Sequence, residues 1–211
     1  MNTTSDDSHD LIVIGASSGG VTALKTLVSQ LPEDLPAAVM IVLHTAPTPT
    51  LALLAGLLDD AGPLPAAYPE DGEAIRSSRI YVAPQDHHLI VRGSHLHLTR
   101  TPKENWTRPA INPLFRSAAG SFRRRVAALV LTGMLEDGTA GLLAVEAAGG
   151  TTVVQDPGDA EFPDMPLSAL DYLDPDHIVL LSELPTLLVQ LAGTPVAGAA
   201  SVPTRCSRRR G

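Results

Sequence analysis

Three residues whose types suit nucleophilic catalysis each follow an apolar run that reads as a buried strand. They are Ser17, His44 and Asp137, which are remote from one another along the chain. A serine, a histidine and an aspartate can serve as nucleophile, general base and orienting carboxylate in acyl transfer. Ligands bind at the carboxyl ends of the strands in open parallel sheets. The sequence therefore predicts that these three side chains meet at one edge of a sheet.

The segment around Ser17 is a glycine-rich turn, Gly-Ala-Ser-Ser-Gly-Gly at residues 15–20. It matches the G-x-S-x-G pattern, in which a tight strand-to-helix turn exposes the serine hydroxyl and small neighbours leave room for a substrate. We expect the backbone N–H of Ser18 to point to where an oxyanion forms. A glycine-rich turn can also bind phosphate or a dinucleotide, or simply reverse the chain. The dinucleotide fingerprint G-x-G-x-x-G is absent, because Ser17 occupies its second glycine position.

Structural roles are also open to His44 and Asp137. His44 ends a wholly apolar strand and could simply cap it. Asp137 precedes a helix predicted to begin at Gly138, where an aspartate can cap the helix N-terminus. Taken together with Ser17, both residues match the roles of a triad. Their order along the chain is Ser, His, Asp, which differs from the Ser, Asp, His order of α/β-hydrolases and argues against that family.

The elements that must position these residues alternate between strands and helices. Uninterrupted apolar runs predict strands buried on both faces, and apolar residues at helical spacing predict amphipathic helices. We expect strands at residues 10–14, 37–43, 79–82, 89–91, 95–99, 126–131, 151–155 and 178–181. We expect helices at residues 21–31, 50–58, 112–122, 138–148, 166–173 and 182–191. This order predicts an α/β fold, a doubly wound and mostly parallel sheet with helices on both faces and a small antiparallel hairpin insertion.

Local signals set the details and the boundaries of the domain. Asn112 followed by Pro113 is a good N-cap and first-turn pair for the third helix. Residues 1–9 are polar and acidic and read as a flexible leader, and residues 10–192 read as one domain. Residues 193–211 are dominated by Ala, Gly, Pro, Ser and Arg, so we expect a disordered tail.

Charge and composition exclude several classes of partner. The formal net charge is −8. Four of the 15 basic residues follow Thr194, where no acidic residue occurs. Residues 1–194 therefore carry 11 basic and 23 acidic side chains, a net charge of −12. Such a body is not expected to bind nucleic acid or an anionic membrane. The longest apolar run, residues 37–43, is too short to cross a bilayer, and the start lacks the apolar core of a signal peptide. With Cys206 as the single cysteine, the chain is expected in the reducing cytoplasm.

A metal site is not expected either. His95 and His97 alternate with leucines and should face solvent from one strand. The only close candidates for further ligands are Asp86, His87 and His88 in the preceding loop, and a tetrahedral metal site needs a defined set of four. We therefore expect neither a metal nor another cofactor.

Several motifs, in order along residues 10–191, resemble the CheB-type protein-glutamate methylesterases. The similar segments are Leu11–Gly20, His44, Tyr81–Pro84, Arg108-Pro109, Leu131–Met134, Asp137-Gly138, Gln155–Pro157 and Met165-Pro166. The resemblance implies that Ser17, His44 and Asp137 form the triad and that Met134 helps to line the oxyanion site. It implies hydrolysis of γ-glutamyl methyl esters on the cytoplasmic helices of chemoreceptors to glutamate and methanol. It also allows deamidation of receptor glutamines by the same attack.

The chain departs from that family's usual pattern at several positions. The base is flanked as Leu43–Thr45 rather than Gln-His-Met, Leu135-Glu136 replaces the commoner Gly-Asn, and Asn112 stands where Asp is common. These differences concern substrate contacts rather than the triad. Family members typically begin with a phosphorylatable receiver domain, whereas nine residues precede the first predicted strand here. We therefore expect a stand-alone catalytic form or a fragment, with no regulator indicated.

Two other functions remain open from the sequence. A nucleotide-binding oxidoreductase would use the glycine-rich turn, but it needs an acidic residue at the end of the second strand to hold a ribose, and His44 stands there. A non-catalytic receptor-docking module would keep the fold without needing a triad. The presence of Ser17, His44 and Asp137 together favours the enzyme.

Overall fold

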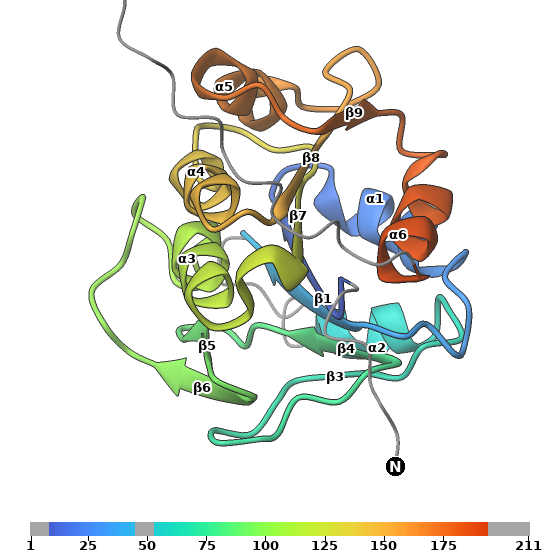
Figure 1. The fold of residues 1–211 in the computed structure, drawn as a ribbon, viewed down its shortest axis with the longest axis vertical. Helices are drawn as coiled ribbons and strands as arrows, with labels where there is room; N and C mark the ends of the chain where they lie inside the picture. Colours follow the sequence, from blue (N-terminus) through green and yellow to red (C-terminus); the bar gives the residue numbers. More distant parts are fainter. Residues whose placement is uncertain (1–8, 45–52, 194–211) are drawn as a thin grey trace, which may run out of the picture.

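A seven-stranded sheet, parallel throughout, forms the centre of the molecule in a computed structural model that describes residues 9–44 and 53–193 (Figure 1). Its strands are β1 (Leu11–Ala16), β2 (Ala38–Leu43), β3 (Ala66–Ala67), β4 (Arg79–Val82), β7 (Val126–Val130), β8 (Thr151–Gln155) and β9 (His177–Val179). Their order across the sheet is β3-β4-β2-β1-β7-β8-β9. From β1 the chain forms β2, β3 and β4 on one side of the sheet and then β7, β8 and β9 on the other side. The switch point of the topology therefore lies at the ends of the central strands.

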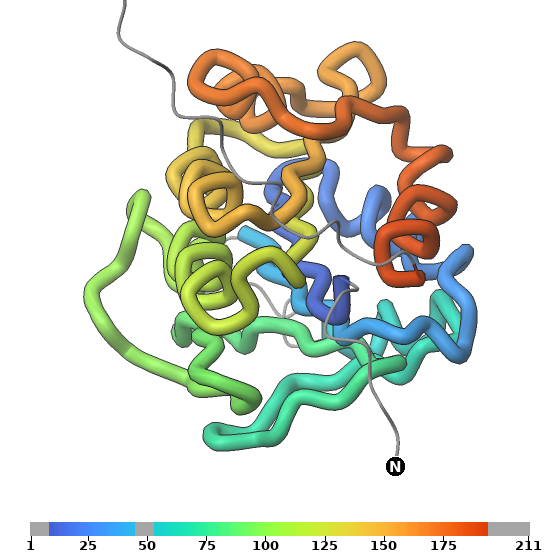
Figure 2. The backbone as a smooth tube through the Cα atoms, in the orientation of Figure 1, coloured from blue at the N-terminus to red at the C-terminus, as the bar shows by residue number. Residues whose placement is uncertain are grey.

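Helices cover both faces of the sheet, as the doubly wound prediction requires (Figures 1 and 2). One face carries α1 (Gly20–Val28), α2 (Leu54–Asp59) and α6 (Leu184–Gly193), and the other carries α3 (Ile111–Phe122), α4 (Thr139–Ala147) and α5 (Asp164–Tyr172). Successive strand residues point to opposite faces. Ile12 and Ile14 of β1 therefore belong to the first core, and Leu11 and Val13 belong to the second.

The predicted hairpin insertion is present as β5 (His88–Arg92) paired antiparallel with β6 (His95–Thr99). It packs against α3 by apolar contacts and by hydrogen bonds. The N–H of Val91 donates to Ser117 Oγ at 3.0 Å, and Ser121 Oγ donates to the Val91 carbonyl at 3.1 Å. The α/β class, the parallel sheet and the insertion are thus confirmed.

Several predicted bounds were wrong by a few residues. The α3 helix begins at Ile111 with Ala110 as N-cap, so Asn112 and Pro113 lie inside its first turn rather than at its cap. The first-turn N–H groups are occupied by a side chain from elsewhere in the chain, which makes a local cap unnecessary. The two-residue strand β3 was not predicted, and a short 3₁₀ helix, Arg123–Arg125, separates α3 from β7.

The described residues extend one residue beyond the predicted domain at each end. His9, assigned to the leader, is 6% exposed; its Nδ1 lies 3.1 Å from the Leu191 carbonyl and its Nε2 lies 2.8 Å from Thr151 Oγ1. Helix α6 continues to Gly193. The remaining leader and tail residues, 1–8 and 194–211, and the first part of the predicted 50–58 helix lie outside the described residues. Within residues 9–44 and 53–193, no helix is long and apolar enough to cross a membrane.

Candidate active site

The three predicted side chains come together at the carboxyl edge of the central strands. β1 lies between β2 and β7, Ser17 follows β1, His44 follows β2, and Asp137 lies in the loop between β7 and α4. Two backbone hydrogen bonds tie these strand ends to one another. The N–H of His44 donates to the Ala16 carbonyl at 2.9 Å, and the N–H of Ser17 donates to the Thr132 carbonyl at 3.0 Å.

Asp137, which is buried, and His44, which is partly buried, form a close pair. His44 Nε2 lies 2.7 Å from Asp137 Oδ2, and the two side chains are 10% and 3% exposed. Thr107 Oγ1 lies 3.3 Å from the same ring nitrogen and donates its own hydrogen to the Glu104 carbonyl at 3.1 Å. Both neighbours of Nε2 therefore accept a hydrogen bond, which fixes the proton of neutral His44 on Nε2 and leaves Nδ1 as the basic nitrogen.

The Asp137 carboxylate is held ionised by the groups around it. Burial by itself raises the pKa of Asp137. The hydrogen bond and charge of His44 and the backbone N–H groups of Ile111 and Asn112 lower this pKa by more than burial raises it, so it lies below the usual value. Oδ2 accepts from Ile111 N at 2.6 Å. Oδ1 accepts from Asn112 N at 3.2 Å and Gly138 N at 3.0 Å. An anion fixed in this way can orient an imidazole and stabilise an imidazolium.

The turn that carries Ser17 is clamped from the end of β7. Thr132 Oγ1 donates to the Ser18 carbonyl at 3.0 Å and accepts from Phe162 N at 2.8 Å, while Thr132 N donates to the buried Gln155 Oε1 at 2.9 Å. The backbone of Gly133 also packs closely against Ser17, since a Cβ added at Gly133 would lie 2.8 Å from the Cβ of Ser17. The resemblance pointed to this segment, but the role of Thr132 in fixing the turn could not be predicted from it.

Ser17 and His44 both open onto solvent-accessible space. They line a cavity of about 400 Å³ together with Asp137, Met134 and residues of the loop 103–109, and a second cavity of about 360 Å³ on the side of Glu161. No hydrogen bond of the described residues uses Ser17 Oγ, so the hydroxyl remains available to a substrate.

The two residues predicted to supply oxyanion donors lie in the same cavity. Ser18 is half-buried and Met134 is 49% exposed. Among the described residues, neither the N–H of Ser18 nor that of Met134 donates a hydrogen bond, whereas the N–H groups of Ser17 and Gly133 are both occupied. Two unengaged backbone donors thus belong to residues of the cavity that Ser17 lines, and such donors can stabilise a tetrahedral oxyanion.

Asp137 also caps a helix, but not the one that its position predicted. Its oxygens accept from the first-turn N–H groups of α3, which begins 26 residues earlier at Ile111. The helix that directly follows, α4, is capped in return by Asn112, whose Oδ1 accepts from Gly138 N at 3.2 Å and Gly141 N at 2.7 Å. The cap and the orienting carboxylate are therefore compatible roles of one residue. The sequence suggested Asn112 as the cap of α3 and as a departure from a family pattern, but not as the cap of α4.

Asn105 is a further residue that sequence analysis missed. Its Nδ2 donates to Asp137 Oδ1 at 2.8 Å, and its φ of 47° lies in the left-handed region that asparagine tolerates better than most residues. Among the described side chains, only His44 and Asn105 make a hydrogen bond or ion pair with this carboxylate. A lone asparagine in an irregular loop carries no sequence signal that would have identified it.

The loop that contains Asn105 is anchored at both ends. Arg108 donates to Asp86 Oδ1 from Nε at 2.9 Å and from Nη2 at 2.6 Å. The buried His88 accepts from Ala110 N at 3.2 Å and places Nε2 3.1 Å from the Pro102 carbonyl. Asp86 and His88 are thus committed to this loop. In the described part of the chain, no group of three or more His, Cys, Asp or Glu residues could hold a metal ion.

Replacing Asn105 with glycine tests this anchoring of Asp137. Glycine keeps the left-handed backbone and removes only the amide donor, so we expect kcat on a small methyl ester to fall about tenfold with KM nearly unchanged. Trp106→Gly is the matched control, because Trp106 also has a positive φ of 63° but is 91% exposed and makes no hydrogen bond with Asp137. Equal rates for the two variants would show that the amide of Asn105 does not act on the carboxylate.

Comparison with known proteins identifies the family of the chain. Residues 12–188 match the family model of the CheB methylesterase. The chain is 38% identical over 161 residues to protein-glutamate methylesterase/protein-glutamine glutaminase 1 of Rhodospirillum rubrum, covering 74% of this chain and 42% of that protein. It is 32% identical over 188 residues to the protein of the same name without the number from Thermotoga maritima, covering 87% of this chain and 54% of the relative.

A solved structure shows the same fold. The crystal structure of the Thermotoga maritima CheB methylesterase catalytic domain superimposes with a TM-score of 0.83 at 32% identity, covering 87% of this chain and 99% of that one. The chain spans about half the length of the curated relatives it matches.

Proposed function

Because this chain belongs to the CheB methylesterase family, we propose that it hydrolyses γ-methyl esters of glutamate side chains on chemoreceptors, giving glutamate and methanol. The observation that carries the proposal is the close pair of His44 and Asp137, 2.7 Å apart, in the cavity onto which Ser17 opens. A serine next to a base with a fixed carboxylate is the arrangement used for acyl transfer. The names of the relatives supply the ester as substrate.

The first half of the reaction forms an acyl-enzyme. Ser17 Oγ attacks the ester carbonyl while Nδ1 of His44 accepts its proton, since Nε2 is already committed to Asp137. The negative oxygen of the tetrahedral intermediate is stabilised by the unengaged N–H groups of Ser18 and Met134. Collapse of the intermediate breaks the bond to the methoxy group, which takes the proton from Nδ1 and leaves as methanol.

The second half repeats these steps with water as the nucleophile. His44 Nδ1 removes a proton from water, the hydroxide attacks the acyl carbonyl, and Ser17 departs with that proton restored. The product is a γ-carboxylate, which restores a negative charge to the receptor helix. Each step is a proton transfer or an acyl transfer, so the groups of the chain suffice without a cofactor.

A second activity follows from the same chemistry. The relatives are named as glutaminases as well as methylesterases. Attack of Ser17 on a γ-amide gives the corresponding tetrahedral intermediate. His44 then protonates its nitrogen, ammonia leaves, and the same acyl-enzyme forms. Because an amide resists attack more than an ester does, we expect deamidation of receptor glutamines to be slower than ester hydrolysis.

The rim of the cavity suits a protein substrate. Trp106, Met134 and Leu135 are 91%, 49% and 69% exposed and all line the cavity. Exposed apolar side chains around a polar site are typical of surfaces that bind another protein. We therefore propose the methylated cytoplasmic helices of chemoreceptors as partners, which places the reaction in the cytoplasm.

The two other functions are less well supported. A dinucleotide-binding enzyme needs an acidic group at the end of β2, where His44 pairs with Asp137 instead. A docking module has no use for a hydrogen-bonded histidine and aspartate beside an unengaged serine hydroxyl. Neither alternative agrees with the names of the relatives.

Methanol release from a methylated receptor fragment is the direct test. The chain should release methanol in proportion to the γ-methyl esters supplied, and the Ser17→Ala variant should release none above the spontaneous rate. The same fragment with glutamines should release ammonia more slowly. Absence of methanol release from a folded preparation would contradict the proposed function.

A further inference from the structure

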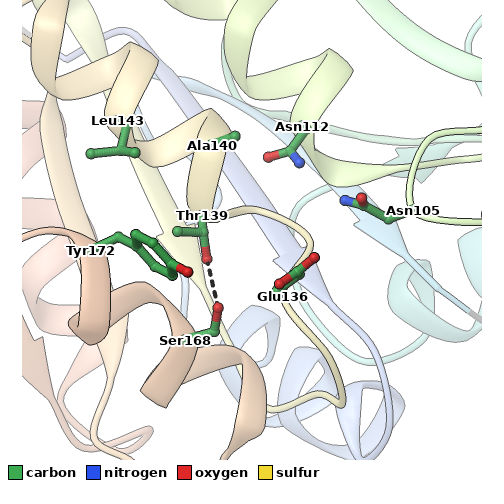
Figure 3. A pocket seen from close by; sticks show the side chains of 8 residues that line it. All are labelled: Asn105, Asn112, Glu136, Thr139, Ala140, Leu143, Ser168 and Tyr172. Atoms are coloured by element: carbon green, nitrogen blue, oxygen red, sulfur yellow. Dashed lines mark hydrogen bonds between the residues drawn. The ribbon is translucent and has the colours of Figure 1, made fainter.

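A second cavity lies beside the active site and takes no part in the proposed mechanism. It measures about 270 Å³ and lies among the loop of Asn105, the start of α4 and the helix α5 (Figure 3). Its lining residues are Asn105, Asn112, Glu136, Thr139, Ala140, Leu143, Ser168 and Tyr172. It lies next to the candidate active site, because Asn105 lines both cavities and Glu136 directly precedes Asp137 in the chain.

The wall of this cavity contains a buried amide with an unused donor. Asn112 is only 6% exposed, and its Oδ1 is fully engaged in capping α4. Its Nδ2 donates to no acceptor in the described part of the chain, yet it is not among the atoms sealed from solvent. This donor is therefore open to the cavity, and an acceptor bound there can form a hydrogen bond with it.

Acceptors and apolar surface complete the lining. In Figure 3 the side chains of Asn112, Glu136 and Tyr172 surround the same space, with the hydrogen-bonded hydroxyls of Thr139 and Ser168 between them, 3.2 Å apart. The carboxylate of Glu136 makes no hydrogen bond or ion pair with a described residue. Ala140 and Leu143 line the apolar part of the wall.

These groups together match one kind of ligand. An unused amide donor and an unused carboxylate acceptor are complementary to a primary amide, whose oxygen accepts and whose nitrogen donates. A carboxylate in the same place would meet the negative charge of Glu136, and none of the described lining residues is basic. An ammonium would satisfy Glu136 but leave the amide of Asn112 without an acceptor. The volume suits a single side chain, being below that of most cofactor pockets.

We infer that this cavity is a substrate subsite for a glutamine side chain that lies one helical turn from the methylated glutamate. The inference rests on the proposed function, which supplies a helical substrate. On a helix, residues three or four apart lie on the same face about 5–6 Å from each other, so one can enter each of two adjoining cavities. The enzyme then hydrolyses an ester faster beside an unmodified glutamine than beside a glutamate.

The test compares two helical receptor fragments that differ only in glutamine or glutamate one turn from the methylated residue. The wild-type chain should show a kcat/KM about tenfold higher for the glutamine fragment, the effect of one buried hydrogen bond gained and one like-charge contact avoided. Ala140→Phe, which fills the cavity from the exposed side of α4, should remove this preference while the rate on a small γ-methyl ester stays unchanged.

Ala147→Phe is the matched control, because Ala147 is exposed on the same helix and does not line the cavity. It should behave as the wild type on all three substrates. Glu136→Gln should raise kcat/KM for the glutamate fragment by several fold and so reduce the preference, since the repelling charge is gone.

Two results overturn the subsite. One is equal kcat/KM for the two fragments with the wild-type chain, and the other is an equal loss on the small ester and on the glutamine fragment in Ala140→Phe. If no substrate releases methanol, the proposed function is wrong. The subsite is then tested separately, by measuring the binding of the two fragments. The Ser17→Ala chain should then bind the glutamine fragment about tenfold tighter than the glutamate fragment and lose the difference with Ala140→Phe added. Equal binding contradicts the subsite independently of catalysis.

Discussion

Replacing Ser17 with alanine is expected to lower turnover by about 10⁴-fold or more while leaving the fold intact. In the proposed mechanism the rate depends on Oγ, because this atom forms the acyl-enzyme with the help of His44. Stability does not depend on Oγ, because this atom makes no hydrogen bond with a described residue. The turn itself is held by the backbone of Ser17, through Thr132 on one side and Gly20 on the other, and alanine keeps both bonds.

The neighbouring serine provides the control for this variant. Ser18→Ala keeps the backbone N–H that is expected to stabilise the oxyanion, so its rate should remain within about threefold of the wild type. Methanol release and covalent labelling by a fluorophosphonate measure the two variants side by side. Labelling that persists in Ser17→Ala and disappears in Ser18→Ala would show that the nucleophile has been assigned to the wrong serine.

The sheet could be predicted closely from the sequence because its strands are buried on both faces. Residues 37–43 form an uninterrupted apolar run, and the structure places β2 at Ala38–Leu43 with every residue buried. A parallel strand covered by helices on both sides has no polar face, so the run itself marks its bounds. The two-residue strand β3 has no such run, since Ala66 and Ala67 pair with β4 only at one edge of the sheet.

The start of α3 shows why a local signal was not enough. Asn112 and Pro113 form a good cap and first-turn pair, yet the helix begins earlier because Asp137 reaches its N–H groups from another loop. A contact across 26 residues decides the cap, and Asn112 is used on α4 instead. Propensity describes what a segment does alone, whereas here the tertiary fold supplies the partner.

In the candidate site, the residues that follow strands were predictable from the sequence and the residues of the irregular loop were not. Each of the three predicted residues follows a strand: Ser17, His44 and Asp137. A correct prediction of the parallel sheet therefore also predicts that they lie together at its carboxyl edge. Asn105 and Thr107 come from an irregular loop, and their contacts with Asp137 and His44 span 32 and 63 residues. Such contacts leave no periodicity in the sequence, and only the folded chain reveals them.

Replacing Asp137 with asparagine is expected to lower turnover by about 10³- to 10⁴-fold, because an amide can stabilise the wrong tautomer of the histidine. In the wild type, Oδ2 accepts from Nε2 of His44 and keeps the proton there. An amide nitrogen in the place of Oδ2 would donate to Nε2 and drive the proton to Nδ1, the atom that must accept it from Ser17. The rate on a small methyl ester measures this loss without any contribution from receptor docking.

The structure adds a cost in stability that a simple helix cap would not predict. Both oxygens of Asp137 accept from buried backbone N–H groups, so asparagine, with one oxygen, leaves at least one donor unpaired and lowers stability by about 1–3 kcal/mol. The pKa of Asp137 is lowered in the fold. The wild type's advantage is therefore complete above the unfolded-state pKa of about 3.9 and is lost as the pH falls through the lower folded value. Urea unfolding at neutral and acid pH measures this difference.

A carboxylate remote from the site separates the two effects. One oxygen of Asp176 accepts from the backbone N–H of Thr152 at 2.8 Å. Asp176 lies before β9, away from the edge of the sheet that holds the candidate site. Asp176→Asn should therefore cost some stability and leave the ester rate within about twofold, whereas Asp137→Asn should lose the rate even under conditions in which both variants are fully folded. A folded Asp137→Asn enzyme with a near-normal rate would reduce Asp137 to the cap of α3 and leave His44 without an orienting carboxylate.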